Sequence, residues 1–162
     1  MSRFAITSYF ALFFLVCIVP LQGQEKEDFF IAPLAEALLY SPNSFEAGGG
    51  LALGYGTGAA IGIRLLYAFD SDKHGILEIL FFLRYYLGGS NARTGPFLQL
   101  NGGPVLFTYD GIGTIRERVG TISAGLSFGW RFPFGEKWFI EPAVRAGYPY
   151  IAGAGVSAGL RL

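Results

Sequence analysis

The clearest pattern in this sequence is a strict alternation of apolar and small or polar residues between Thr121 and Phe132. The apolar side chains occupy the even positions, namely Ile122, Ala124, Leu126, Phe128, Trp130 and Phe132. The odd positions hold Thr, Ser, Gly and Arg. Because successive side chains of a strand point to opposite faces, this period of two predicts a strand between two different environments.

The same alternation recurs along the chain and is separated by turn signals such as Asp110-Gly-Ile-Gly113 and Pro133-Phe-Gly-Glu-Lys137. The segment at 28–40 also suits a helix, because Leu34-Ala-Glu-Ala-Leu-Leu39 favours one. The pattern predicts strands at 28–40, 45–53, 59–69, 77–87, 97–109, 121–132, 138–148 and 152–162.

These strands predict an all-β fold, an antiparallel up-and-down transmembrane β-barrel of about eight strands, as one domain over residues 24–162. Transmembrane strands need about 9–11 residues each. The region after residue 23 leaves roughly 17 residues for each strand and its connection, which fits eight strands with short loops.

The distribution of charge favours a membrane barrel over a soluble, lipocalin-like one. The charged residues share a face with Gly, Ser, Ala and Thr, whereas the other face is wide, apolar and aromatic at its ends. A membrane barrel turns its apolar face outward, toward lipid. The polar face would then line the lumen, where we expect Glu36, Glu46, Arg64, Glu78, Arg84, Arg131, Glu141, Arg145 and Arg161.

Two interpretations of these lumen charges remain open. Buried charges are tolerated when they are paired, and four acids against five arginines nearly match, which favours an ion-pair network that plugs the lumen. The alternative is a polar channel that selects small solutes or ions. An eight-stranded barrel is just wide enough for side chains to fill, so the plug is the preferred interpretation.

Aromatic residues near the strand ends predict two girdles at the membrane interfaces. Trp130, Phe132, Phe134 and Trp138 flank one predicted turn, and Tyr109, Tyr148 and Tyr150 would mark the opposite interface.

The N-terminus has the features of a secretory signal peptide over residues 1–23, with Arg3 before an apolar run that Pro20 ends. An uncleaved anchor helix is the alternative. Val16 stands before Cys17, where a lipoprotein needs a small residue, so lipidation is not expected. Export followed by insertion predicts a location in the bacterial outer membrane.

Composition adds few candidates for chemistry. The formal net charge is +0, which provides no electrostatic basis for binding nucleic acid. Asp70, Asp72 and His74 could hold a metal but lack a fourth ligand, and Gly54-Tyr-Gly-Thr-Gly58 is better explained by a hairpin turn than by a phosphate loop. With one histidine and one cysteine, the sequence predicts neither an enzyme nor a cofactor.

Several segments resemble the small eight-stranded outer-membrane barrels of the OmpX and OmpA-transmembrane-domain type. They are Gly62-Ile-Arg-Leu-Leu-Tyr67, Gly95-Pro-Phe-Leu-Gln-Leu-Asn-Gly-Gly103, Gly125-Leu-Ser-Phe-Gly-Trp-Arg-Phe132 and the run from Phe134 to Tyr148. The resemblance implies contact with outer-membrane lipid and insertion by the barrel-assembly machinery. It assigns no catalytic residues and no extracellular partner.

Three functions follow as hypotheses. The first is a non-enzymatic barrel with a structural, adhesive or host-interaction role, although the short predicted loops offer it no evident binding surface. The second is a narrow pore for small solutes or ions, and the third is a soluble periplasmic carrier.

Overall fold

A computed structural model describes residues 29–41, 44–69, 75–88, 94–110 and 116–162. In these ranges the regular structure is β-strand, and no helix there is long and apolar enough to cross a membrane. The strands are β1 (Phe29–Ser41), β2 (Ser44–Gly56), β3 (Ala59–Phe69), β4 (Gly75–Tyr86), β5 (Gly95–Asp110), β6 (Arg116–Phe134), β7 (Trp138–Tyr148) and β8 (Ala152–Arg161).

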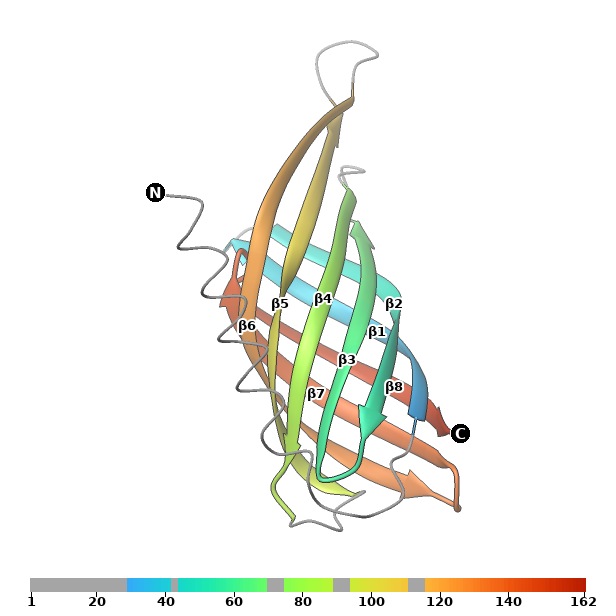
Figure 1. Ribbon diagram of the computed structural model, residues 1–162. Helices are drawn as coiled ribbons and strands as arrows, with labels where there is room; N and C mark the ends of the chain where they lie inside the picture. Colours follow the sequence, from blue (N-terminus) through green and yellow to red (C-terminus); the bar gives the residue numbers. More distant parts are fainter. Residues whose placement is uncertain (1–28, 42–43, 70–74, 89–93, 111–115) are drawn as a thin grey trace.

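The eight strands form a closed, entirely antiparallel barrel (Figure 1). Each strand pairs with the next in sequence, and β8 pairs with β1, so the predicted up-and-down topology is confirmed. Following paired residues once around the wall leads from Phe29 back to Leu39 on the same strand, a stagger of ten residues (39 − 29). For eight strands this stagger corresponds to a tilt of roughly 40° from the barrel axis.

The strand bounds largely follow the predicted alternation. The two segments at 59–69 and 138–148 are strands over their full predicted lengths. The first segment is strand β1, so its alternative as a helix is wrong, because both of its edges pair with neighbouring strands. In the predicted turn at 54–58, β2 continues to Gly56, whose φ of 126° favours glycine.

The outer face of the barrel is apolar and exposed. Along β6, the side chains of Ile122, Leu126, Phe128 and Phe132 are all exposed, whereas Ser123, Ser127 and Arg131 between them are buried. A soluble barrel would have the reverse arrangement. The exposed apolar belt therefore identifies the outer surface as a lipid-facing one.

The lumen contains large aromatic side chains in addition to the small and polar residues expected from the sequence. Phe30, Phe82, Tyr86, Phe97 and Phe139 form a buried cluster near the end of the barrel where β1 begins and β8 ends. We call this end the terminal end. Their rings fit because they lie over glycines: the Phe139 ring lies against Gly159, and the Phe97 ring against Gly129. The lumen face is therefore not made of small and charged residues alone, as the sequence had led us to expect.

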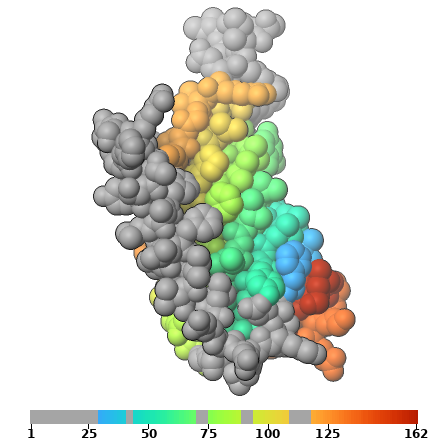
Figure 2. All heavy atoms as spheres, in the orientation of Figure 1, coloured from blue at the N-terminus to red at the C-terminus, as the bar shows by residue number. Residues whose placement is uncertain are grey.

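At the opposite end, β5 and β6 project beyond the other strands, so we call it the projecting end (Figure 1; Figure 2). The two strands pair with each other as far as Asp110 and Arg116, but β4 pairs with β5 only to Thr108. On its other side, β6 pairs with β7 only as far as Ala124. The predicted start of β6 at residue 121 was too late, and the short loop expected there is an extended hairpin.

Candidate functional site

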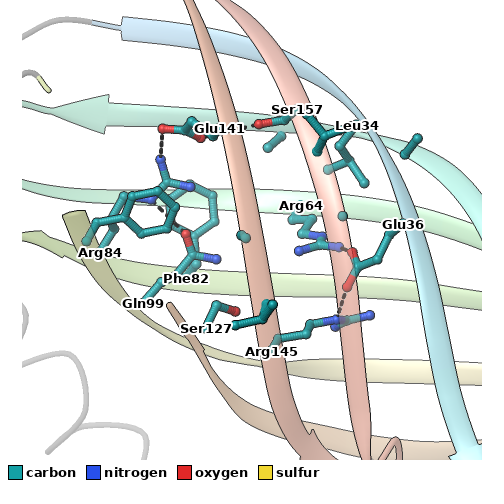
Figure 3. Close-up of a pocket in the computed structure, with 17 residues that line it drawn as sticks. Leu34, Glu36, Arg64, Phe82, Arg84, Gln99, Ser127, Glu141, Arg145 and Ser157 are labelled. Carbon is teal, nitrogen blue, oxygen red and sulfur yellow. Dashed lines mark hydrogen bonds and ion pairs between the residues drawn. The ribbon is translucent and has the colours of Figure 1, made fainter. Parts of the chain in front are cut away.

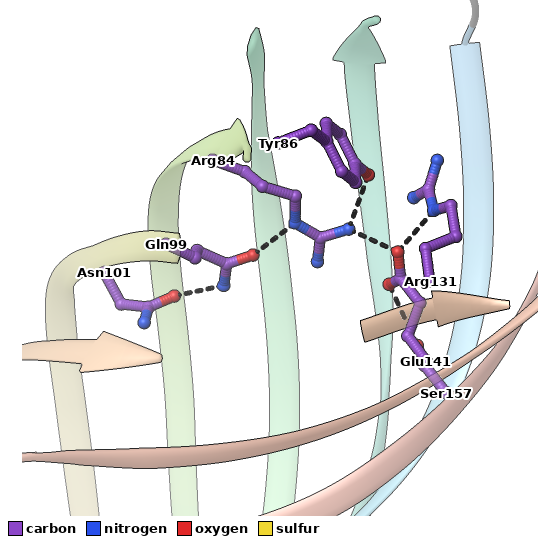
Figure 4. A network of polar contacts seen from close by, with 7 residues as sticks. All are labelled: Arg84, Tyr86, Gln99, Asn101, Arg131, Glu141 and Ser157. Atoms are coloured by element: carbon purple, nitrogen blue, oxygen red, sulfur yellow. Dashed lines mark hydrogen bonds and ion pairs between the residues drawn. The ribbon is translucent and has the colours of Figure 1, made fainter. Parts of the chain in front are cut away.

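The first polar network in the lumen lies near the terminal end and centres on Glu141 (Figure 4). Its Oε1 atom accepts hydrogen bonds from Arg84 Nη1 at 2.7 Å and from Arg131 Nε at 2.5 Å. Its Oε2 atom accepts a hydrogen bond from the Ser157 hydroxyl at 3.3 Å. One buried carboxylate thereby joins strands on opposite sides of the lumen.

A chain of amide and hydroxyl groups extends this network along β5 and β6 (Figure 4). Arg84 Nε donates to Gln99 Oε1 at 2.8 Å, and Gln99 Nε2 donates to Asn101 Oδ1 at 2.6 Å. Asn101 Nδ2 then donates to the Ser127 hydroxyl at 2.8 Å. We call Tyr86 and these residues, together with Arg131, Glu141 and Ser157, the terminal-end network.

The aromatic cluster supports the two guanidinium groups of this network. The Arg131 guanidinium carbon lies 3.8 Å from the centre of the Phe139 ring, and that of Arg84 lies 4.1 Å from the centre of the Phe97 ring. Arg84 Nη1 also donates to the Tyr86 hydroxyl at 3.1 Å. Stacking on desolvated aromatic faces stabilises a cation by up to about 2 kcal/mol, which helps to offset its burial.

A second network lies nearer the projecting end and joins two acids to two arginines. Glu36 forms ion pairs with Arg64 and Arg145. Arg145 Nη2 lies 2.7 Å from Glu78 Oε2, and Tyr40 donates its hydroxyl to Glu78 Oε1 at 3.0 Å. We call these five residues the projecting-end network; its formal charge from the two acids and two arginines is zero.

A small chamber separates the two networks inside the barrel (Figure 3). Glu36, Arg64 and Arg145 face it from one side, and Arg84, Gln99 and Glu141 from the other. The lumen is thus crossed by two layers of paired charge, and the space between them is also lined by apolar side chains such as Leu34, Phe82 and Val156.

Seven of the nine predicted lumen residues belong to these two networks, and the other two are Glu46 and Arg161. Glu46 is buried near the start of β2 and interacts electrostatically with Tyr40 of the projecting-end network. Arg161 is half-buried at the terminal end, where its Nη2 atom donates to the backbone carbonyl of Glu136 at 2.7 Å. Arg161 was expected among the lumen charges, but as the last residue of β8 it lies at the rim and contacts the β6–β7 turn.

Tyr150 corrects one prediction for the aromatic girdles. It was expected at a membrane interface, but it is 1% exposed, and its ring centre lies 4.0 Å from the Arg145 guanidinium carbon. Tyr150 belongs to the connection between β7 and β8, where the alternation of a strand no longer fixes which way a side chain points. The connection turns inward, and the Tyr150 ring makes an edge contact with Tyr40.

The other predicted girdle residues are exposed on the outer face. Trp130, Phe132, Phe134 and Trp138 surround the turn between β6 and β7 at the terminal end, and Tyr148 lies near the projecting end. The stacked rings of Trp130 and Phe132 have centres 6.0 Å apart. The side chain of Tyr109 lies outside the described residues.

Sequence reasoning missed the neutral members of the networks. Gln99, Asn101, Ser127 and Ser157 are on the same alternating faces as the charged residues, so strand parity could have identified them. Tyr40 could also have been found, because it lies four residues after Glu36 on the same face of β1.

Some sequence predictions cannot be compared with the structure. The signal peptide, Cys17 and the Asp70, Asp72 and His74 group lie outside the described residues. Within the described part, no three acidic, histidine or cysteine side chains gather in a way that could hold a metal ion.

Comparison with known proteins reveals a similarity of fold. No family model matches the sequence. No curated protein sequence matches it either. Neisserial surface protein A has a TM-score of 0.62 at 15% identity, with 85% of this chain and 99% of that chain covered.

Two further structures give the same result. The N-terminal β-barrel domain of Pseudomonas aeruginosa OprF has a TM-score of 0.61 at 13% identity, covering 83% of this chain and 97% of that chain. Ail, the attachment invasion locus protein of Yersinia pestis, has a TM-score of 0.54 at 12% identity, covering 84% and 97%. The chain has the fold of the small eight-stranded outer-membrane β-barrels. The resemblance seen in the sequence is confirmed at the level of the fold, and the exposed apolar belt fits the lipid environment of such barrels.

Proposed function

We propose that this protein is a non-enzymatic outer-membrane barrel that binds an extended segment of another protein at its projecting hairpin. Between Arg116 and Ser123, β6 pairs with β5 along one edge, but no described residue pairs with its other edge. This free edge is the observation that supports the role. The unpaired backbone groups of such an edge can add a strand from a partner, with main-chain hydrogen bonds supplying affinity.

The register identifies which backbone groups are available. Pro104 lies opposite Ile122, and the β4–β5 ladder is interrupted at Pro104, so Pro104 directs its backbone nitrogen toward β4. In an antiparallel pair, Ile122 then directs its N–H and C=O away from β5. By the same parity, Arg118 and Gly120 present their N–H groups at the free edge.

We infer that the projecting end lies outside the cell, because outer-membrane barrels have short periplasmic turns and longer extracellular connections. Two of the structures with this fold are themselves described in related terms, one as a surface protein and one as an attachment invasion locus protein. That similarity supports an adhesive or host-interaction role for this chain.

Panning a random-peptide display library against the folded barrel in nanodiscs tests the role. We expect selected peptides to bind wild type and Gly120→Ala equally, because Ala keeps the edge N–H and its Cβ would make an ordinary 3.5 Å contact with Leu106. Gly120→Pro removes one edge donor and should weaken binding by about tenfold. If no peptide binds better than to empty nanodiscs, or if both variants bind alike, the proposal is wrong.

The two lumen networks support a plug, and we propose that the lumen is closed at rest. Each layer holds its acids and arginines in direct ion pairs across the barrel, and the aromatic cluster fills the terminal end. The second candidate function is a narrow pore, because the chamber between the layers leaves some space inside the lumen. Planar-bilayer recordings separate the two, since a plugged barrel is silent and a pore conducts.

Export and insertion complete the proposal. We infer that residues 1–23 are removed as a signal peptide and that the barrel-assembly machinery inserts residues 24–162. N-terminal sequencing of the protein from an outer-membrane fraction should give a mature chain beginning near residue 24. Residence in a carbonate-washed membrane pellet would exclude a soluble periplasmic carrier.

A further inference from the structure

The β1–β2 ladder has a register shift between Leu39 and Ser41, near its end. Three of the other ladders are interrupted within their length, and a proline lies at each of these three interruptions. The β1–β8 ladder skips Ala32 and Pro33, the β4–β5 ladder skips Gly103 and Pro104, and the β6–β7 ladder skips Glu141 and Pro142. The register is the same on both sides of each interruption, so no residue is inserted. Proline has no N–H, and each proline therefore leaves one facing carbonyl without its ladder donor.

The carbonyls that lose a donor belong to Ala158, Ile79 and Trp130. The three prolines are exposed on the outer face, among the apolar side chains of the lipid-facing belt. Inside a bilayer no water replaces a missing ladder bond, so a barrel wall is weakened where such a bond is absent.

Two of the three interruptions flank the same hairpin, β7–β8. Pro142 pairs with Val156 of β8, Val156 pairs with Ala35 of β1, and Ala35 is two residues from Pro33. The two interruptions consequently lie at similar depth in the wall. By contrast, the ladders on both sides of the β2–β3 hairpin are continuous through the membrane-facing belt.

Lumen side chains hold the hairpin where the backbone does not. Arg131 and Glu141 are the skipped residue pair of the β6–β7 ladder, and their side chains form the 2.5 Å ion pair. At the other interruption, the Phe139 ring covers Gly159, which is the skipped partner of Ala32. Glu141 also reaches across the lumen to Arg84 on β4, and Arg145 of the same hairpin pairs with Glu36 and Glu78. Of these two residues, Glu141 is the one that lies at a ladder interruption.

We propose that the β7–β8 hairpin can separate from the rest of the barrel wall and that the ion pairs of Glu141 hold it in the closed position. When the Glu141 ion pairs break, the β6–β7 ladder separates first, at Pro142. The chamber between the two networks, which this hairpin lines with Glu141 and Ser157, then opens sideways toward lipid.

Amide hydrogen exchange of the full chain in nanodiscs tests whether the β7–β8 hairpin opens locally. We expect amides of β7 and β8 to exchange about tenfold faster than amides of the β2–β3 hairpin, because each missing ladder bond lowers the local opening free energy. Restoring donors with Pro33→Val and Pro142→Val should slow exchange in β7–β8 by roughly three- to tenfold. Pro104→Val restores a donor on the opposite side of the barrel and should leave β7–β8 exchange unchanged.

A substitution at Glu141 tests whether its ion pairs hold the hairpin closed. Glu141→Gln should accelerate exchange in β7–β8 alone, and the two proline replacements should reverse that effect. Heat-modifiable gel migration verifies that each variant is a closed barrel. If Glu141→Gln does not form a closed barrel, the exchange rates of wild type and the proline variants still test whether the hairpin opens. Equal exchange in all hairpins, or the same slowing from Pro104→Val as from Pro142→Val, would overturn the proposal.

Discussion

Residue parity decides whether each strand side chain faces lipid or the lumen. Leu126 and Ser127 are neighbours on β6, yet Leu126 is 57% exposed on the outer face and Ser127 is 4% exposed and accepts a hydrogen bond from Asn101. The two positions therefore differ in environment and not in local conformation: a polar group is suited to the lumen at Ser127, whereas a charge is unfavourable against lipid at Leu126.

A charge at the middle of the lipid face should destabilise the barrel. We expect Leu126→Arg to lower the free energy of unfolding by about 2–4 kcal/mol, because a guanidinium there replaces an apolar group in contact with hydrocarbon. Phe134→Arg, on the same strand near the terminal end, is the matched control and should cost only about 0–1 kcal/mol. Urea titration in lipid vesicles measures both, and equal costs would contradict the assigned orientation in the bilayer.

Gly159 is required by the ring that lies on it. A Cβ at this position would overlap the Phe139 side chain, so Gly159→Ala should cost about 1–3 kcal/mol. Phe139→Leu shortens the side chain, and the double variant should be less destabilised than the sum of the single variants. Additive costs in the same titration would show that the two residues do not share this space.

At the level of the elements, β5 and β6 differ from the other strands in length. Beyond Thr108 and Arg118 the described residues of these two strands pair only with each other, so this part of the hairpin adds no strand pairing to the barrel wall. Its alternation is also weaker, since Gly120, Arg118 and Val119 are all exposed.

Shortening this hairpin should separate binding from folding. We expect replacement of residues 108–118 by Asn-Gly, between the paired Phe107 and Val119, to give a tight turn and a closed barrel. The free energy of unfolding should change by less than about 1 kcal/mol, because the removed residues are outside the bilayer. Peptides that bind the wild-type edge should bind this variant at least about tenfold more weakly, because the edge donor of Arg118 is removed while those of Gly120 and Ile122 remain. Unchanged binding would show that the part of the edge in residues 108–118 makes no contribution.

At the level of the whole molecule, closure of the sheet brings together charges that are far apart in the sequence. Glu78 and Arg145 are 67 residues apart and Arg84 and Glu141 are 57 apart, yet each pair is in direct contact across the lumen. Each network holds side chains from several strands, so it exists only in the closed barrel.

Removing the acids should convert the plug into an anion-preferring leak. We expect wild type to be silent in planar bilayers and Glu36→Ala/Glu141→Ala to conduct, because Arg64, Arg84 and Arg131 would lose their carboxylate partners and Arg145 would keep only Glu78. The remaining excess of positive charge would repel itself. The reversal potential in a KCl gradient should indicate a preference for chloride. Glu136→Ala, on the exposed turn after β6, should remain silent.

A silent double variant that still shows heat-modifiable migration would contradict the assignment of the plug to these pairs. A preference for cations would contradict the predicted sign of the charge that remains.

The alternation of residue types was enough to predict the strands, their faces and the apolar exterior, because a period of two directly records which side of a strand meets lipid. It also identified seven of the charged residues that meet in the two networks. Their pairing depended on the stagger of the closed wall, which alternation within single strands does not encode. Three features could be seen only in the folded barrel: the inward side chain of Tyr150, the aromatic rings that lie over glycines, and the two proline interruptions that flank one hairpin. Each of these depends on which strands lie next to each other and at what depth, which is fixed only when the barrel closes.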